Sequence, residues 1–227
     1  MVISDLTGRQ PWKPVRADVV DPRSDDTRHA AVWSFADPVA AISSAPVGGG
    51  TAAVDWALNI GVTDPYHRTD LDAHAREVAA KLGLVGTGAA LLTAYDVQRI
   101  VRAEDSGVVV DATVGVTKPT WAADEDGVHA RRSDDAWIPG TINIVVQCPV
   151  ALSPAAAVNA VMTVTEAKSQ ALIEAGVPGT GTASDAVLVC WPPTVPAEAF
   201  GGPRSVWGAR IARAVHAAMV EGLEVHR

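Results

Sequence analysis

The chain has 227 residues and a hydrophobic content of 48%, which is enough for one domain with a sizeable core. A formal net charge of −8 opposes a broad nucleic-acid surface, because such a surface needs clustered Lys and Arg to neutralise phosphates. The first residues contain no apolar signal segment, and no apolar run approaches the roughly 20 residues that cross a bilayer. We therefore expect a cytoplasmic protein with neither nucleic-acid nor membrane partners.

The beginning of the chain is polar and the segments that follow it are apolar. Residues 1–29 are rich in Asp, Arg and Pro, which predicts an N-terminal extension or loop ahead of a single domain over residues 30–227. Three apolar runs open this domain, namely "AAVWSF", "AAISSAPV" and "AVDWALNIGV". Because Pro and Gly punctuate these runs, they predict separate strands joined by tight turns.

The first helix is expected in "TDLDAHAREVAAKLGL". Thr69 or Asp70 can cap its beginning, and Gly83 can supply the left-handed residue that ends it. Strands are then expected at "GAALLTAY", "GVVVDATVGV" and "TINIVVQCPV". The last of these is apolar almost throughout, as is typical of a central strand covered on both faces.

Two further helices are predicted in the C-terminal half. Ser153 and Pro154 form a good pair of N-cap and first helical residue, and Gly176 can end the helix after Ala175. After the strand "AVLVCW", apolar or small residues recur with the helical period within "PRSVWGARIARAVHAAMVEGL". The alternation predicts an α/β or α+β fold, a single layered domain whose mixed β-sheet is covered by helices.

A glycine-rich loop precedes the strand "AVLVCW", in the stretch "VPGTGTASDAVLVCW" of residues 177–191. A dinucleotide fingerprint needs a third glycine where this chain has Ser184, and its glycines follow a strand and open a helix. No Lys-Ser/Thr pair follows to complete a phosphate-binding P-loop. The loop therefore predicts a polar site of another kind at the beginning of a buried strand.

The helix that begins after Ser153 carries a polar stripe. Its residues recur at i, i+4, i+7 and i+11, and they are Asn159, Thr163, Glu166 and Gln170. A mostly uncharged stripe can line a cleft, and it can also face water in a protein that uses few lysines.

Three segments together resemble the adenosylcobinamide amidohydrolase family of cobamide salvage. They are "GTINIVVQCPVALSPAAAVNAVMTVTEAKSQALIEAGV", "GTGTASDAVLV" and "FGGPRSVWGARIARAVHAAM", and the earlier "ISSAPVGGG", "WALNIGV" and "GTGAALLTA" fit the family in the same order. The resemblance implies that residues 30–227 are a catalytic domain. It implies hydrolysis of the amide between the corrin propionyl arm and aminopropanol, giving adenosylcobyric acid. It also implies no separate cofactor, because the cobalt corrinoid is the substrate.

The chain departs from the family pattern in "TKPTWAADEDGVHARRSDDAW", which puts the choice of corrinoid in doubt. A non-catalytic corrinoid-binding protein is the main alternative, and a nucleotide-binding enzyme is a third hypothesis that the loop order disfavours. Assembly into a homo-oligomer stays open.

The candidate catalytic residues follow from the needs of amide hydrolysis, which are an activated nucleophile, donors for the oxyanion and an acid for the leaving amine. We predict Asp185 as base or orienter, Thr180 or Thr182 as nucleophile or donor, and Glu166 as a second acid or base. The structural alternative for Asp185 is a turn bond at the start of a strand, and for the threonines it is hydrogen bonding to local backbone.

Substrate-binding candidates lie elsewhere in the chain. A turn of small residues would let a large planar ligand approach the backbone closely, and two amides lie in apolar runs where each needs a partner. An arginine at a helix start lies where anions are favoured. These candidates are Ser44, Gly48, Gly49, Asn59, Asn143 and Arg204. A plain hairpin turn, backbone partners on a neighbouring strand and a helix cap are the respective structural alternatives.

We predict no metal site. The cluster His67, Asp70, Asp72 and His74 lacks zinc-protease spacing and is better explained as an acidic helix start. Cys148 and Cys190 each lie inside an apolar run, which indicates two separate buried thiols rather than a disulfide or a metal pair.

Overall fold

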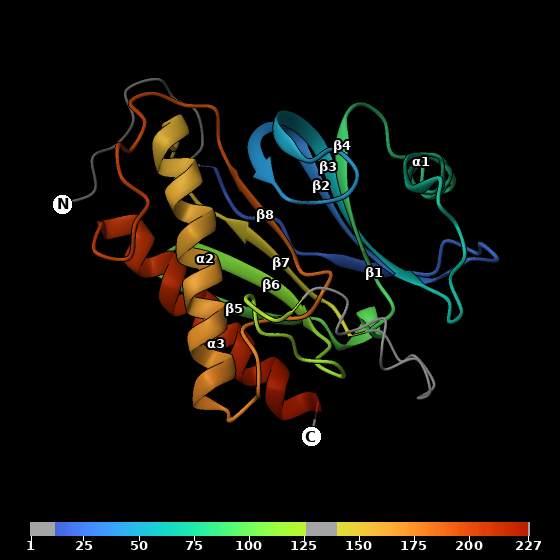
Figure 1. Ribbon diagram of the computed structural model, residues 1–227. Helices are drawn as coiled ribbons and strands as arrows, with labels where there is room; N and C mark the ends of the chain where they lie inside the picture. The colour runs from blue at the N-terminus through green and yellow to red at the C-terminus, as the bar shows by residue number, and fades with distance from the viewer. Residues whose placement is uncertain (1–11, 126–139, 227) are drawn as a thin grey trace.

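The computed structural model describes residues 12–125 and 140–226, and within them one mixed sheet is covered by helices (Figure 1). The strands run in the order β4-β3-β2-β8-β7-β6-β5, with β1 paired to β2. Pairs β3–β4 and β7–β8 are parallel and the other pairs are antiparallel. The predicted single layered domain with a mixed sheet is therefore confirmed. The strands are β1 (Asp18–Val20), β2 (Thr27–Ser43), β3 (Gly50–Val62), β4 (Gly88–Thr93), β5 (Val101–Asp105), β6 (Val108–Val114), β7 (Ile142–Gln147) and β8 (Ala186–Trp191); the helices are α1 (Leu71–Lys81), the short 3-10 helix η1 (Val97–Arg99), α2 (Pro154–Glu174) and α3 (Val206–His226).

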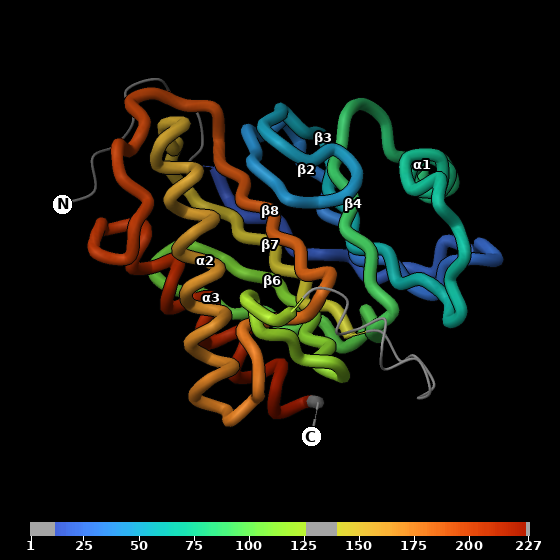
Figure 2. The backbone as a smooth tube through the Cα atoms, in the orientation of Figure 1, coloured from blue at the N-terminus to red at the C-terminus, as the bar shows by residue number. Residues whose placement is uncertain are grey.

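The sheet bends, so that strands far apart in its order face one another. Trp33 on β2 donates its indole N–H to Asp111 on β6 at 2.8 Å, although β8 and β7 lie between these strands in the sheet. An inner apolar cluster accordingly joins residues of β2, β3 and β4 to residues of β7 and β8. A second cluster lies between β5–β8 and the helices α2 and α3, and a third lies between β2–β4 and α1. Figure 2 shows the strands β2–β4 facing the strands β6–β8, with α1 and α2 on opposite outer sides.

Strand β2 differs from the expectation of separate short strands. It runs unbroken from Thr27 to Ser43 and contains both "AAVWSF" and the first half of the following run. Its register against β3 shifts between Ser34 and Val39, and Pro38 lies within this irregularity. A bulge tolerates proline because a residue left out of the ladder needs no N–H, so the proline that predicted a break instead marks a bend.

The segment before residue 30, predicted as an extension or loop, contains β1 and the first residues of β2. Residues 1–11 of that segment lie outside the described part of the chain, as do residues 126–139 of the divergent stretch.

The three predicted helices are confirmed, together with most of their boundaries. Asp70 is the N-cap residue of α1, although its side chain binds Arg68 and not the helix backbone. Ser153 caps α2 by accepting the N–H of Ala156 at 3.2 Å. Gly83 and Gly176 both have positive φ, as their predicted role at helix ends requires.

Strand β7 is buried along its whole length, as predicted for a central strand. Its neighbour Cys148 packs in the cluster under α2 and α3, whereas Cys190 on β8 packs in the inner cluster, so the two buried thiols lie on different faces of the sheet. Burial raises the pKa of the Cys148 thiol to about 11 and raises that of Cys190 as well. Among the described residues, no helix combines the length and the apolar character that crossing a membrane requires.

Candidate functional site

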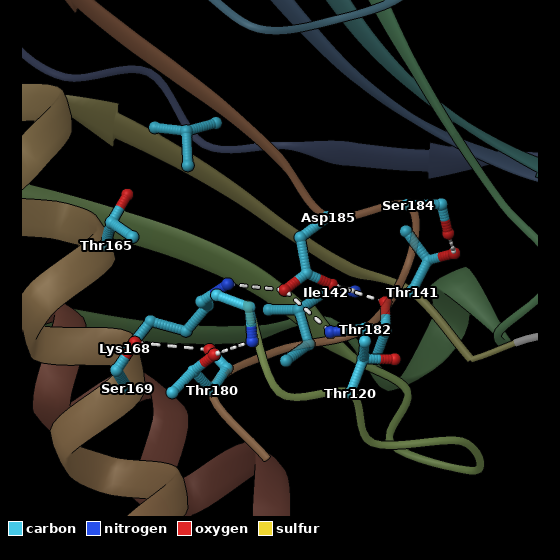
Figure 3. A network of polar contacts seen from close by, with 12 residues as sticks. Thr120, Thr141, Ile142, Thr165, Lys168, Ser169, Thr180, Thr182, Ser184 and Asp185 are labelled. Atoms are coloured by element: carbon cyan, nitrogen blue, oxygen red, sulfur yellow. Dashed lines mark hydrogen bonds and ion pairs between the residues drawn. The ribbon is translucent and has the colours of Figure 1, made fainter. Parts of the chain in front are cut away.

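The glycine-rich loop lies where β7, α2 and β8 meet (Figure 3). Its backbone pairs with a segment from the middle of the chain: Thr180 N–H donates to the Thr120 carbonyl at 2.9 Å, and Thr120 N–H donates to Gly181 at 2.8 Å. The Thr180 hydroxyl oxygen accepts the N–H of Ala122 at 3.2 Å, and the Thr180 carbonyl accepts the hydroxyl of Ser169 on α2 at 3.2 Å. The loop is therefore held from two sides before it enters β8.

Asp185 is the centre of the polar network. Its Oδ1 accepts the Thr182 hydroxyl at 2.5 Å and the N–H of Ile142 at 3.0 Å. Its Oδ2 accepts Lys168 Nζ at 2.5 Å and the N–H of Thr182 at 3.1 Å. The bond from Thr182 N–H is local to the loop, but it comes from three residues before Asp185 and is not the Asx-type bond to the N–H two residues after it. One carboxylate therefore joins the beginning of β7, helix α2 and its own loop.

Lys168 is the residue of this network that the sequence reasoning missed. Its side chain is about one-tenth exposed, and the ion pair with Asp185 satisfies a charge that would otherwise be costly to bury. A signal was present in the sequence, because Lys168 is the only basic residue of α2 and lies one turn from Val164 and from Leu172, both buried. A lone lysine within an apolar stripe indicates a partner on the element below.

Two glycines allow this close packing. A Cβ atom at Gly181 would overlap both the Asp185 carboxylate and the Lys168 amine, and one at Gly179 would overlap the backbone of Thr120. The glycines of "GTGT" are therefore needed for the approach of protein groups to the loop.

A second polar pair borders the network. The hydroxyls of Thr141 and Ser184 lie 2.7 Å apart, next in sequence to Ile142 and Asp185 respectively. Ser44 lies at the same end of β8, where its N–H donates to the Val187 carbonyl and its hydroxyl oxygen accepts the Val187 N–H at 3.0 Å. Thr182, Ser184 and Ser44 thus gather around the first residues of β8.

The structure does not bring Glu166 to Asp185. Glu166 and Lys168 are two positions apart in sequence, which corresponds to a rotation of about 200° around an α-helix. Glu166 therefore projects from nearly the opposite side of α2 to Lys168. Glu166 is exposed, and the remaining members of its stripe are directed away from the network: Thr163 is buried and donates its hydroxyl to Gly201, while Asn159 and Gln170 are exposed. The prediction of Glu166 as an acid or base beside Asp185 therefore has no support in this arrangement.

Of the remaining substrate-binding candidates, the two asparagines are fully enclosed. Asn143 donates to the Asn59 side chain at 2.8 Å and to the Leu92 carbonyl at 3.0 Å, and Asn59 donates to Thr113. These contacts join the two facing parts of the sheet, and both asparagines are about 1% exposed. Their partners are protein groups of the inner layer, but the Oδ1 atom of Asn143 is buried with no hydrogen-bond partner among the described residues.

The other candidates lie in turns. Gly48 has a φ of 68° and packs on the backbone of Gly88 at the beginning of β4, and Gly49 packs on Ala45. Arg204 is exposed in the turn before α3, close to Gly201, which packs on Ala156 in the first turn of α2. Twelve residues of helix, or about 18 Å, separate Ala156 from Lys168. Arg204 and Asp185 therefore do not form one compact site.

The histidine segment of residues 67–74 runs into the first turn of α1, and His74 on this helix has protein partners. His74 is fully buried, and its ring nitrogens lie 2.8 Å from the Thr27 hydroxyl and 2.7 Å from the Tyr66 hydroxyl. Burial lowers the pKa of His74 and raises that of Tyr66. Among residues 12–125 and 140–226, no group of three or more His, Cys, Asp or Glu side chains is arranged to hold a metal ion.

Comparisons with known proteins identify the family. The family model described as adenosylcobinamide amidohydrolase matches residues 15–227. The adenosylcobinamide amidohydrolase of Methanosarcina mazei is 29% identical over 191 residues, which cover 80% of this chain and 89% of that protein. That of Halobacterium salinarum is 31% identical over 207 residues, covering 88% of this chain and 87% of that protein.

A solved structure from Pyrococcus horikoshii aligns with 95% of this chain and 82% of its own at a TM-score of 0.42 and 11% identity, a likeness too weak to identify a fold. The family model, in contrast, spans almost the whole chain, and the Halobacterium relative matches it over most of its length. The chain therefore belongs to the adenosylcobinamide amidohydrolase family.

Proposed function

We propose that this chain hydrolyses the amide between the corrin propionyl arm and aminopropanol of adenosylcobinamide, releasing adenosylcobyric acid. Family membership supports an amidohydrolase acting on a corrinoid. The observation that carries the site is the Lys168–Asp185–Thr182 network, in which a hydroxyl is held 2.5 Å from a carboxylate that is itself held by an ammonium group.

In the proposed reaction Thr182 is the nucleophile. Its Oγ1 attacks the amide carbonyl carbon while its proton moves along the existing hydrogen bond to Asp185 Oδ1. The same proton then passes to the departing amine, the C–N bond breaks, and an ester to Thr182 remains. Water hydrolyses this ester to give the carboxylic acid and regenerate the hydroxyl.

Lys168 and the N–H groups of Ile142 and Thr182 act as positioning groups in this scheme. They occupy the other acceptor sites of the carboxylate, which fixes its plane toward the Thr182 hydroxyl. We further propose that no metal of the protein takes part, that the corrinoid is the small-molecule partner, and that the enzyme works in the cytoplasm.

The test is incubation of the purified chain with adenosylcobinamide, followed by chromatographic separation of the corrinoids. We expect adenosylcobyric acid and free aminopropanol in equal amounts. The same assay is applied to the variant Asp185→Asn. Its matched control is Asp37→Asn, which makes the same chemical change at an exposed residue in the bulge of β2.

Binding of the corrinoid without product would reject the proposal in favour of a non-catalytic corrinoid-binding protein. Neither binding nor product would reject both.

A further inference from the structure

The outward side of α2 is an exposed face with an unusual composition. Val158, Met162 and Ile173 are between 51% and 56% exposed, although they belong to a helix that packs closely on the sheet below. Thr165 and Ser169 lie between them along the same side, since all five residues follow the spacing i, i+4, i+7, i+11 and i+15. We call these five residues the open α2 face. Figure 1 shows α2 as an outermost element of the molecule.

This face borders the candidate catalytic loop. Ser169 belongs to the open α2 face and donates its hydroxyl to the Thr180 carbonyl at 3.2 Å, as Figure 3 shows. A shallow depression of about 480 Å³ includes Thr165, Ser169 and Ile173 in its lining. Thr180 also contacts the segment around Thr120 and Ala122. Trp121 lies between these two residues and is 46% exposed. The open α2 face is thus joined through Ser169 and Thr180 to the loop that carries Thr182 and Asp185.

The charges along this side of α2 are acidic. Glu166 and Glu174 line the same depression, and both are exposed. The helix has one basic residue, Lys168, and its charge is already paired with Asp185. Glu174 accepts Gln170 Nε2 at 2.7 Å and lies 2.7 Å from His216 Nε2, so Glu166 is the main acidic group that a ligand here would meet, together with apolar surface and two hydroxyls.

We infer that the open α2 face is the platform for the corrin ring, which lies on Met162 and Ile173 while its propionyl arm reaches over Ser169 to Thr182. This inference rests on the proposed function. Adenosylcobinamide suits the face in three respects. Its macrocycle is broad and largely apolar, and its peripheral amides can bind hydroxyls. Cobalt(III), a corrin monoanion and an adenosyl carbanion leave it with one positive charge.

From Met162 to Ile173 the face extends over eleven residues, or about 16 Å. With the corrin ring on this face, Glu166 would attract the positively charged substrate and would not take part in the chemical step.

The decisive variants place a positive charge on the platform. Met162→Lys and Ile173→Lys keep a long side chain at exposed positions, so the fold should persist, as far-UV circular dichroism can verify. We expect each to raise KM for adenosylcobinamide about tenfold with kcat changed less than threefold. The reason is that the corrin ring binds the face equally in the ground state and in the transition state. The matched control is Val85→Lys, because Val85 is 84% exposed in the loop between α1 and β4. KM values equal to that of the control in both variants would overturn the inference.

Binding measured without turnover separates this inference from the proposed function. Equilibrium dialysis of adenosylcobinamide is carried out in a Thr182→Ala background, with and without Ile173→Lys. If the wild type forms no product but Ile173→Lys still weakens binding, the proposed reaction fails and the platform stands. Equal Kd values with and without Ile173→Lys overturn the platform whatever the reaction does.

Two further measurements test the assigned ligand. Glu166→Gln should raise KM about two- to fivefold at low ionic strength and less at 0.5 M salt, because screening weakens exposed charges. A KM that is insensitive to this change at low salt would contradict the electrostatic part of the inference. Size-exclusion chromatography of Ile173→Lys tests the competing occupant, a second copy of the chain: a shift from dimer to monomer with unchanged KM would assign the face to self-association and overturn the inference.

Discussion

Lys168 on α2 and Asp185 before β8 are seventeen residues apart in sequence, and their Nζ and Oδ2 atoms lie 2.5 Å apart at the centre of the candidate site. The pair joins a helix to the strand that follows it in a parallel βαβ unit, and Asp185 also accepts the N–H of Ile142 on the first strand of that unit. Loss of either partner would leave the other charge buried and unpaired.

Replacement of Asp185 by Asn should reduce turnover by roughly 10² to 10⁴, since the proton acceptor for Thr182 is removed. An Asn amide presents N–H donors toward groups that are themselves donors, so the free energy of unfolding should also fall by about 1–3 kcal/mol. Corrinoid turnover and urea unfolding measure the two effects. Wild-type turnover in folded Asp185→Asn protein would limit Asp185 to a structural role.

The Thr182 hydroxyl should be indispensable, whereas its methyl group should not be. We expect Thr182→Ala to lose at least about 10² in kcat, and Thr182→Ser to keep kcat within about tenfold of the wild type, because Ser retains the hydroxyl beside Asp185. Both variants are assayed at saturating adenosylcobinamide. Equal losses in the two variants would show that the nucleophile lies elsewhere.

Two glycines next to α2 provide a matched pair. Gly181→Ala should disrupt the network, because the new Cβ overlaps the Asp185 carboxylate and the Lys168 amine, so turnover should fall at least about tenfold together with stability. Gly176→Ala meets no neighbouring atom but adopts a φ of 73°, which should cost only about 1 kcal/mol of stability and leave kcat unchanged. Comparable losses of kcat in both would point to a general effect on the loop.

Activity should survive exhaustive chelation. The proposed reaction uses a hydroxyl, a carboxylate and an ammonium group, none of which needs a bound ion. Turnover is compared before and after dialysis against EDTA. Loss of activity that added zinc or manganese restores would overturn this expectation and redirect attention to the His67 and His74 segment.

Acid should destabilise the chain partly through His74. Its folded pKa lies below the ordinary value of 6.5, so as pH falls through about 6.5 the unfolded state takes up a proton that the folded state does not. The free energy of unfolding therefore decreases with falling pH in this range, by at most about 1.4 kcal/mol per pH unit from this residue. His74→Gln should show a smaller decrease between pH 7.5 and 5.5 in urea unfolding. An unchanged decrease would exclude His74 as a source.

The sequence predicted the elements whose signals are local. Caps, glycine stops and helical periodicity located the three α-helices of the described residues, and continuous burial of β7 followed from its apolar run. Strand β2 was divided wrongly because Pro38 is a chain breaker in most contexts, and only the pairing with β3 and β8 shows that it occupies a bulge. The bend of the sheet depends on such long-range pairings and has no local signature.

The candidate site was predicted in part for the same reason. Asp185 and Thr182 lie within one loop, so their proximity could be expected from sequence. The carboxylate of Glu166 makes it a candidate acid or base by residue type. Whether Glu166 or Lys168 reaches Asp185 depends on which side of α2 meets β8. Periodicity gives the angle between two helical residues and not the direction of either relative to the sheet.

The four hydrogen bonds of Asp185 have a consequence for how this enzyme can change over time. The groups that would perform the chemistry also close the βαβ unit, so catalysis and architecture draw on the same few atoms. A substitution that loosens the carboxylate to make it more reactive would weaken one of the contacts that hold α2 to β7 and β8, and one that tightens these contacts would restrain the reacting hydroxyl. Adaptation to new corrinoids is therefore more accessible through the exposed side chains of α2 than through the loop itself.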